Sequence, residues 1–174
     1  MPITEPGGAD GVVEAGDNGT HTLRFERRFE HPIDRVWTAL TEREELLGWW
    51  GAADELDLVE GGRIVLRWLN TDHKGEYVTL HGKVVRYEPP RLLEYETDVH
   101  GVLRFELRAA GNATDLTFTS TVGFPPEMHP LALAGWHLHL EFLDGLLAGE
   151  RADLVHLPMD RWERRRDQYE AALR

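Results

Sequence analysis

The chain has 174 residues, a length typical of one domain, and its 31 acidic against 19 basic side chains give a formal net charge of −12. It contains no cysteine, which excludes disulfides, thiolate metal ligands and cysteine nucleophiles. The acidic balance disfavours nucleic acid and anionic lipid as partners. Since the sequence contains neither a secretory signal pattern nor an apolar run long enough to span a bilayer, we expect a cytoplasmic protein without membrane insertion.

The first segment, residues 1–19, is rich in glycine and poor in large apolar side chains, which predicts a disordered tail. Residues 20–30 then place Leu23 and Phe25 in alternation with polar side chains, the pattern of a half-buried strand. Arg27 interrupts this pattern on its apolar side.

Two short helices are predicted next, over 31–40 and 41–48. The first has Pro32 at a position that a first helical turn tolerates. The second begins with Thr41 and Glu44, the spacing of a capping box, and ends at the glycine that precedes a double tryptophan.

Strand patterns separated by turn residues follow as far as residue 122, which predicts one curved antiparallel sheet of six or seven strands. The longest pattern needs a bulge or bend, which we place at Gly82. Beyond the first strand, the predicted strands are 55–59, 63–69, 76–88, 91–98, 102–109 and 115–122.

Two helices complete the chain. A long apolar helix begins near Pro130, and a final helix over 159–174 is capped by Asp160 and docks through Trp162, Tyr169 and Leu173. We therefore expect an α+β domain over 20–150 with a helical extension over 151–174 packed on it.

Four stretches carry a family likeness. They are "FEHPIDRVWTALTEREELLGWWG", "LDLVEGGRIVLRW", "HGKVVRYEPPRLLEYE" and "AGWHLHLEFLDGLL". In this order and spacing they resemble the branch of the START-related (SRPBCC) superfamily named after an activator of the heat-shock-protein-90 ATPase. The resemblance implies a helix-grip fold, in which a curved sheet wraps around the long C-terminal helix with a cavity between them. It does not specify a function, because the superfamily includes lipid carriers, hormone receptors, cyclases and co-chaperone domains.

The long helix carries two histidines. On a helical projection His137 falls on the polar arc beside Glu141, so we expect it to be exposed. His139 falls between two apolar stripes, either as a core residue bonded to a carbonyl group or as a polar group in a cavity roof. We expect Ser120, the only serine of the chain, as its partner on the sheet.

Metal binding by this pair is disfavoured, because positions i and i+2 on a helix point about 160° apart and cannot close on one ion. No catalytic residue and no cofactor site is predicted, since the chain lacks a nucleophile elbow and a phosphate-binding loop. We interpret His100 and the other histidines in predicted turns as solvated.

Alternation on the strands and the helix suggests the side chains that would line a cavity. Trp50 is expected at its mouth, because it stands at a helix end outside any periodic face. The candidate ligand-binding residues are Trp50, Leu66, Trp68, Tyr95, Phe105, Phe118, Ser120, Trp136, His139, Leu140 and Leu143.

Three functions remain open at this point. The first is a non-catalytic carrier or sensor of an apolar small molecule such as a lipid, an aromatic or a polyketide-like compound. The second is a co-chaperone-like domain that acts on a chaperone ATPase, and the third is a cyclase- or dehydratase-like pocket enzyme. Self-association through an edge strand or the last helix is a further possible contact.

Overall fold

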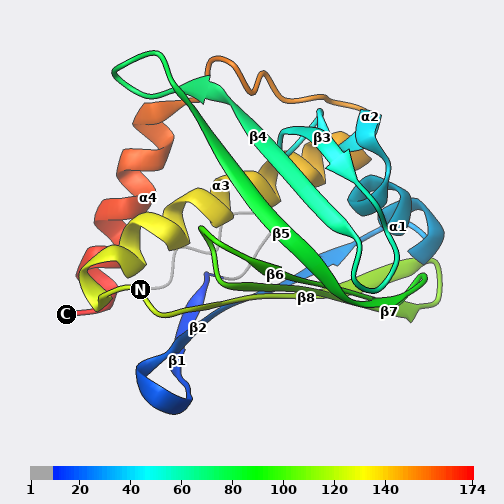
Figure 1. Cartoon of the computed structure of the whole chain (residues 1–174), viewed down its shortest axis with the longest axis horizontal. Helices are drawn as coiled ribbons and strands as arrows, with labels where there is room; N and C mark the ends of the chain where they lie inside the picture. Colours follow the sequence, from blue (N-terminus) through cyan, green and yellow to red (C-terminus); the bar gives the residue numbers. More distant parts are fainter. Residues whose placement is uncertain (1–9) are drawn as a thin grey trace.

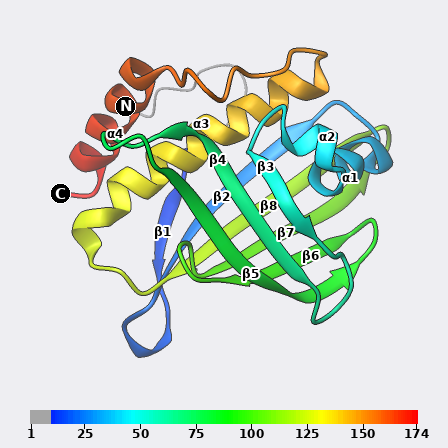
Figure 2. The ribbon, with the colours of Figure 1, turned by 45° about the horizontal axis from the view of Figure 1, so that its top comes forward.

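The computed structural model describes residues 10–174, which form an eight-stranded antiparallel sheet and four α-helices. The sheet curves around the long helix α3 (His129–Leu147), which lies across its concave face (Figures 1 and 2). This is the helix-grip architecture expected from the sequence. The strands are β1 (Val12–Ala15), β2 (His21–Phe29), β3 (Ala52–Leu56), β4 (Arg63–Thr71), β5 (Tyr77–Glu88), β6 (Leu92–Thr97), β7 (Val102–Ala110) and β8 (Ala113–Val122).

The sheet is ordered β1-β2-β8-β7-β6-β5-β4-β3, so the long-range pair β2–β8 joins the start of the domain to its last strand. Phe118 on β8 is opposite both Phe25 on β2 and Phe105 on β7, and all three side chains are buried. This row of aromatic rings forms the floor on which α3 packs, as the period-two alternation of these strands predicts.

One more strand is present than the sequence predicted, and it lies within the supposed tail. Residues Val12–Ala15 pair with β2, and Asp17–Gly19 form a short 3-10 turn between the two strands. The prediction of disorder is therefore wrong for residues 12–19, while 1–9 lie outside the described residues. A contact with the last helix also holds this segment: the backbone N–H of Gly11 donates to the Tyr169 hydroxyl at 2.8 Å.

The short helices α1 (Ile33–Thr41) and α2 (Arg43–Leu46) cover one end of the sheet. The predicted capping box is absent, because the Thr41 hydroxyl donates to the carbonyl of Trp37 in the preceding turn at 2.7 Å. Trp49, after α2, is held instead by its indole N–H, which donates to the Ala39 carbonyl at 2.9 Å. This bond ties the double tryptophan to α1.

Two strand details differ from the sequence prediction. The irregularity in the β5–β6 pairing lies between Val84 and Arg86 and not at Gly82, which keeps its partner on both neighbouring strands. Strand β3 begins at Ala52, three residues earlier than predicted.

The last helix, α4 (Met159–Ala172), lies beside the N-terminal half of α3 (Figure 1). Tyr169 is buried against α3 as predicted, but Leu173 is 45% exposed. Asp160 does not cap the helix; its carboxylate pairs with Arg164. No helix within residues 10–174 is long and apolar enough to cross a membrane.

Candidate functional site

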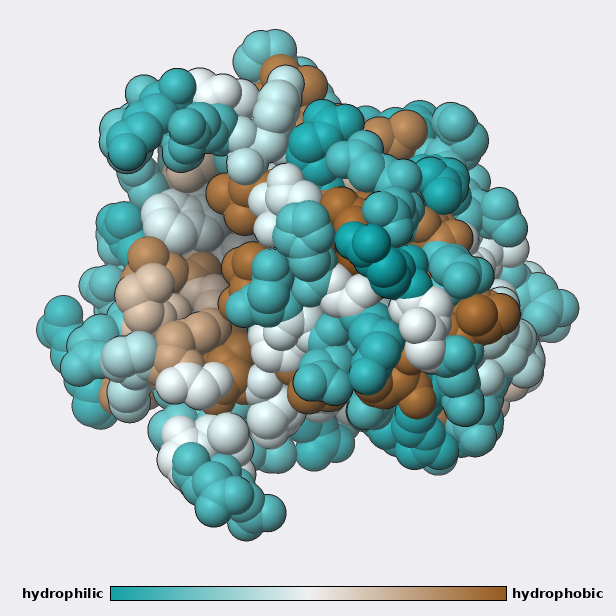
Figure 3. Space-filling view, viewed as in Figure 1, coloured by the Kyte–Doolittle hydropathy of each residue, from teal (hydrophilic) through white to brown (hydrophobic). Residues whose placement is uncertain are grey.

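A cavity of about 290 Å³ opens between α3, the ends of β4 and β5, and α4 with its preceding linker. Figure 3 shows the hollow, with hydrophobic side chains around it, on the left of the molecule. Exposed Val78 and Met159 stand at its rim. The lining residues are Trp68, Asn70, Val78, His100, Leu131, Ala132, Gly135, Trp136, Leu138, His139, Leu157, Met159 and Trp162.

His139 is fixed on both sides of its ring. Its Nδ1 lies 2.9 Å from the Trp49 carbonyl oxygen, and its Nε2 lies 3.2 Å from the indole Nε1 of Trp68. Because a carbonyl only accepts and an indole N–H only donates, the proton must be on Nδ1. Burial lowers the pKa of His139 to about 4, although the Trp49 carbonyl opposes this shift. His139 is therefore neutral at pH 7, and both its nitrogens are already bonded within the protein.

Aromatic rings build the inner wall of the cavity. The ring centroid of His100 lies 5.3 Å from that of Trp68 and 5.3 Å from that of Trp136. Behind this wall Trp50 packs against both tryptophans, at 6.3 Å and 5.7 Å. Since the wall consists of packed rings, its shape is set before any ligand arrives.

The turn that carries His100 is fixed by three hydrogen bonds. The Ser120 hydroxyl donates to the His100 carbonyl at 2.9 Å, and the His100 N–H donates to the Thr97 hydroxyl, which in turn donates to the Gly101 carbonyl. Gly101 has φ of +64°, and a Cβ there would lie 1.9 Å from the Thr121 carbonyl oxygen. Only glycine fits at this position without a steric clash, so the local sequence holds His100 at the cavity.

The candidate residues from the sequence divide into two groups. Trp68, Trp136 and His139 line the cavity. The others are buried in the core around it. Trp50 is among them at 1% exposure, so the prediction that it stands at the mouth is wrong. Ser120 does not bond to His139, because its hydroxyl is used by the His100 carbonyl. The core group is Trp50, Leu66, Tyr95, Phe105, Phe118, Ser120, Leu140 and Leu143.

Two features of the site are absent from the sequence prediction. His100, expected in solvent, lies between two tryptophans, and its pKa is lowered to about 4 by burial and by the nearby His139. The outer wall comes from Leu157, Met159 and Trp162, which lie on or just before α4. A signal for His100 existed in the sequence, since Gly101 marks a tight turn directly after a predicted strand.

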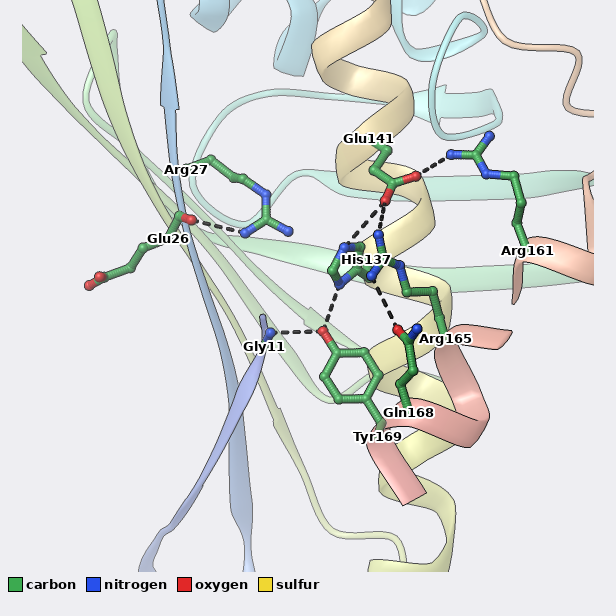
Figure 4. Close-up of polar contacts among 9 residues, drawn as sticks. All are labelled: Gly11, Glu26, Arg27, His137, Glu141, Arg161, Arg165, Gln168 and Tyr169. Atoms are coloured by element: carbon green, nitrogen blue, oxygen red, sulfur yellow. Dashed lines mark hydrogen bonds and ion pairs between the residues drawn. The ribbon is translucent and has the colours of Figure 1, made fainter. Parts of the chain in front are cut away.

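His137 lies on the other side of α3 and is 3% exposed, so its predicted exposure is wrong. Its Nδ1 lies 2.7 Å from the Tyr169 hydroxyl and its Nε2 lies 3.3 Å from a Glu141 carboxylate oxygen (Figure 4). Glu141 also accepts hydrogen bonds from Arg161 and, at 2.9 Å, from the buried Arg165. The helix α4 thus covers the polar arc of α3 with a network of charges.

The charges of this network determine the state of Glu141. Partial burial would raise its pKa, but hydrogen bonds from His137 and Arg165 and the charge of Arg161 outweigh burial and lower the pKa to about 2. Arg27 points toward the same network from β2 (Figure 4), and burial lowers its pKa. The carboxylate of Glu141 therefore stays ionised and joins α4 to α3.

A larger depression of about 590 Å³ lies on the outer face of the sheet, over β2, β7 and β8. Ion pairs cross it, such as Arg28 with Asp115 at 2.8 Å and Arg24 with Glu26 at 2.6 Å. Because the pairs are satisfied and the walls are polar, this depression has less to offer an apolar ligand than the cavity beside α3.

Across residues 10–174 there is no group of three or more histidine, aspartate or glutamate side chains placed to hold a metal ion. The cavity also lacks a charged side chain in its lining. What it offers chemically is a set of aromatic surfaces and neutral polar groups.

Comparison with solved structures identifies the fold. The crystal structure of CalU16 from Micromonospora echinospora matches with a TM-score of 0.70 at 22% identity, covering 93% of this chain and 96% of that one. The protein encoded by gene BPP1335 from Bordetella parapertussis matches with a TM-score of 0.69 at 25% identity, covering 97% and 94%. A conserved protein of unknown function, EF2215 from Enterococcus faecalis, matches with 0.70 at 19% identity, covering 94% and 90%.

No curated protein matches the sequence. The family model described as "Activator of Hsp90 ATPase homolog 1-like protein" matches residues 30–148, from the end of β2 to the end of α3. The matched region ends before α4, which supplies the outer wall of the cavity. The family resemblance seen in the sequence is thus confirmed: the chain belongs to the Activator of Hsp90 ATPase homolog 1-like family within the SRPBCC superfamily.

Proposed function

We propose that the protein binds a small apolar molecule in the cavity between the sheet and α3, as a carrier or a sensor. The observation that carries this proposal is the composition of the cavity: tryptophan and aliphatic side chains with few polar groups and no charged side chain. Sites for small molecules combine a mainly apolar lining with a few placed polar groups in this way.

The size of the cavity limits the ligand. About 290 Å³ is at the lower end of the range for small-molecule sites, roughly 300 to 1,000 Å³. A compound with one or two rings suits this volume better than a long-chain lipid. The flat walls of Trp68 and Trp136 also favour aromatic rings, which gain from edge-to-face and offset contacts.

The bonding of His139 argues against a catalytic role for this residue. A general base needs a free nitrogen within reach of the substrate, and both nitrogens of His139 are bonded to Trp49 and Trp68. Its role in this proposal is to hold the indole of Trp68 in place as part of the wall.

Naphthalene is the probe for the first test, measured by thermal unfolding and by tryptophan fluorescence. A ligand at one hundred times its Kd stabilises the folded state by about 2.7 kcal/mol. For a chain of this size we expect the Tm to rise by roughly 5–10 °C. Quenching or a shift of the tryptophan emission should saturate at the same concentration.

Gly135 offers a variant that fills the cavity without harming the fold. It lies inside α3 and lines the cavity, and a Cβ there would have only the Trp162 Nε1 within 4 Å, at 3.9 Å. Leucine is a better helix former than glycine, so Gly135→Leu should keep or raise the Tm. It should also abolish the response to naphthalene.

Gly145→Leu is the matched control, because Gly145 lies in the same helix but outside the cavity lining. This variant should bind naphthalene as the unchanged chain does. Binding that survives Gly135→Leu, or a chain that responds to no apolar probe, would contradict the proposal.

A co-chaperone-like role is the alternative that the description of the family supports. In that case the Tm should be indifferent to apolar probes, and the chain should change the ATP turnover of a purified heat-shock-protein-90 chaperone. Gly135→Leu should leave that effect unchanged, so the two functions are separable with one pair of variants.

A further inference from the structure

We propose that the ligand is an electrically neutral aromatic molecule carrying one hydroxyl or carbonyl group, and that the imidazole of His100 is the group that recognises it. This inference rests on the proposed function, and it names the class of ligand and the residue that selects it.

The polar groups around the cavity differ in whether they can still bond to a ligand. The indole N–H of Trp68 and Nε2 of His139 bond to each other, and Nδ1 of His139 bonds to the Trp49 carbonyl. None of these atoms has a hydrogen-bonding position left for a ligand. The Nε1 of Trp136 and the Oδ1 of Asn70 are buried without a partner, so neither atom presents accessible surface to the cavity. Trp162 and Asn70 also line the cavity, but the indole Nε1 of Trp162 and the Nδ2 of Asn70 can only donate.

The imidazole of His100 is different because it can both donate and accept. Its backbone atoms are bonded to Ser120 and Thr97, but among residues 10–174 its ring nitrogens have no hydrogen-bond partner, and they are not among the fully enclosed polar atoms. The ring lines the cavity between Trp68 and Trp136. A neutral imidazole has one N–H donor and one acceptor nitrogen, so it can serve either a hydroxyl or a carbonyl group.

The position of His100 is fixed before binding. Ser120 holds its carbonyl, Thr97 holds its N–H, and Gly101 sets the turn. A fixed polar group loses little conformational entropy when a ligand binds, which makes its contribution to affinity larger.

The charge of the ligand follows from the lining. No acidic or basic side chain lines the cavity, and a buried ion without a partner is costly. The pKa of His100 is lowered to about 4 by burial and by His139, so its ring carries no charge at pH 7. A carboxylate would therefore lose its hydration without meeting a positive charge, whereas a phenol or a ketone would not.

Three probes of the same shape test this inference at pH 7: naphthalene, 2-naphthol and 2-naphthoate, titrated by isothermal calorimetry. One added neutral hydrogen bond should make 2-naphthol bind about 2- to 10-fold more tightly than naphthalene. The carboxylate 2-naphthoate should bind at least about 10-fold more weakly than 2-naphthol.

The variant His100→Phe should remove the preference for 2-naphthol and leave naphthalene binding in place. The control is His81→Phe, since His81 is exposed on β5 and outside the cavity lining. A measurement on the unchanged chain guards against a misfolded variant: the imidazole ¹⁵N shifts of His100 should move with 2-naphthol and stay with naphthalene.

The outcomes separate the two proposals. If none of the probes binds, the proposed function fails. If naphthalene and 2-naphthol bind equally and the ¹⁵N shifts of His100 do not distinguish them, the cavity binds ligands but His100 does not select them. If 2-naphthoate binds most tightly, the ligand is an anion and the inference is overturned.

Discussion

Two histidines on one helix have opposite surroundings. His137 lies in a network of charged side chains between α3 and α4, where Glu141, Arg161 and Arg165 meet. His139, about 160° further round the helix, is bonded only to a carbonyl group and an indole, on the wall of a cavity without charges. Both are almost completely buried, at 3% and 6% exposure.

The difference shows that the two sides of α3 have different structural roles. On the side of His137, charges attach α4 to the body of the domain, which keeps the outer wall of the cavity in place. On the side of His139, neutral hydrogen bonds fix the aromatic wall without introducing a charge. The same residue type serves both, because its neighbours on other elements differ.

The largest effect that we expect from this contrast is a loss of folding stability at low pH. Since the pKa of His139 in the folded chain is about 4 and its usual value is 6.5, the unfolded chain takes up the proton first. The contribution of neutral His139 to the free energy of unfolding is complete above pH 6.5. As the pH falls toward 4, on the order of 3 kcal/mol of this contribution is lost. Urea unfolding at pH 7, 5.5 and 4.5 measures this loss together with that from His100, whose pKa is also lowered to about 4, and the His139 variant separates the two.

The variant His139→Phe should change the shape of that pH dependence. At pH 7 it should cost about 1–2 kcal/mol, because the Trp49 carbonyl and the Trp68 indole lose their partner. Near pH 4.5 the variant should approach or exceed the stability of the unchanged chain. Parallel pH profiles would show that His139 is not buried in its neutral form.

The next effect concerns the charged side. Glu141→Gln removes the carboxylate that bonds to the buried Arg165 and to the ring of His137, and we expect a loss of about 2 kcal/mol at pH 7. The matched control is Glu163→Gln on α4, which is exposed and has no ion pair with another described residue. Equal losses in the two variants would show that the network contributes nothing.

The contribution of Glu141 to stability also depends on pH. Its pKa of about 2 lies below the usual value, so its contribution is present above pH 4.5 and is lost as the pH falls toward 2. The Gln variant should lack this part of the acid-induced loss of stability. The effect is distinct from that of His139, which occurs at higher pH.

The smallest effect concerns the hydroxyl of Tyr169, which joins His137 to the N–H of Gly11. Tyr169→Phe should cost about 1 kcal/mol and speed the hydrogen exchange of the Gly11 amide, while exposed Tyr77→Phe should do neither. Unchanged exchange at Gly11 would mean that other contacts hold the segment before β1.

Much of the fold could be predicted from the sequence. Alternation of Leu103, Phe105 and Leu107 with charged residues fixed which face of β7 meets α3, since period two leaves no other choice. The prediction of disorder for residues 12–19 was wrong because β1 is short and mostly exposed, and pairing with β2 stabilises it where composition does not.

The site was less predictable. Trp68, Trp136 and His139 were expected at the cavity and line it, because periodicity places a side chain on a face. It does not say which residues on that face meet empty space, so Trp50 and Phe105 are core residues. Whether these residues bind a ligand stays a prediction. His100 was interpreted as solvated and Trp162 only as a docking residue of the last helix, because a turn and a later helix bring them to the cavity.

By itself, then, the sequence determined the alternating strands, the two apolar stripes of α3 and the family. These depend on local periodicity and on motifs that stand close together in the chain. Only the tertiary structure decided that α4 covers His137, that Ser120 holds His100, and that His139 bonds to Trp49 and Trp68. Those contacts join residues 20 to 90 positions apart, and the hydrogen-bond partner of a buried polar group is chosen by whichever donor or acceptor the folded chain brings within about 3 Å.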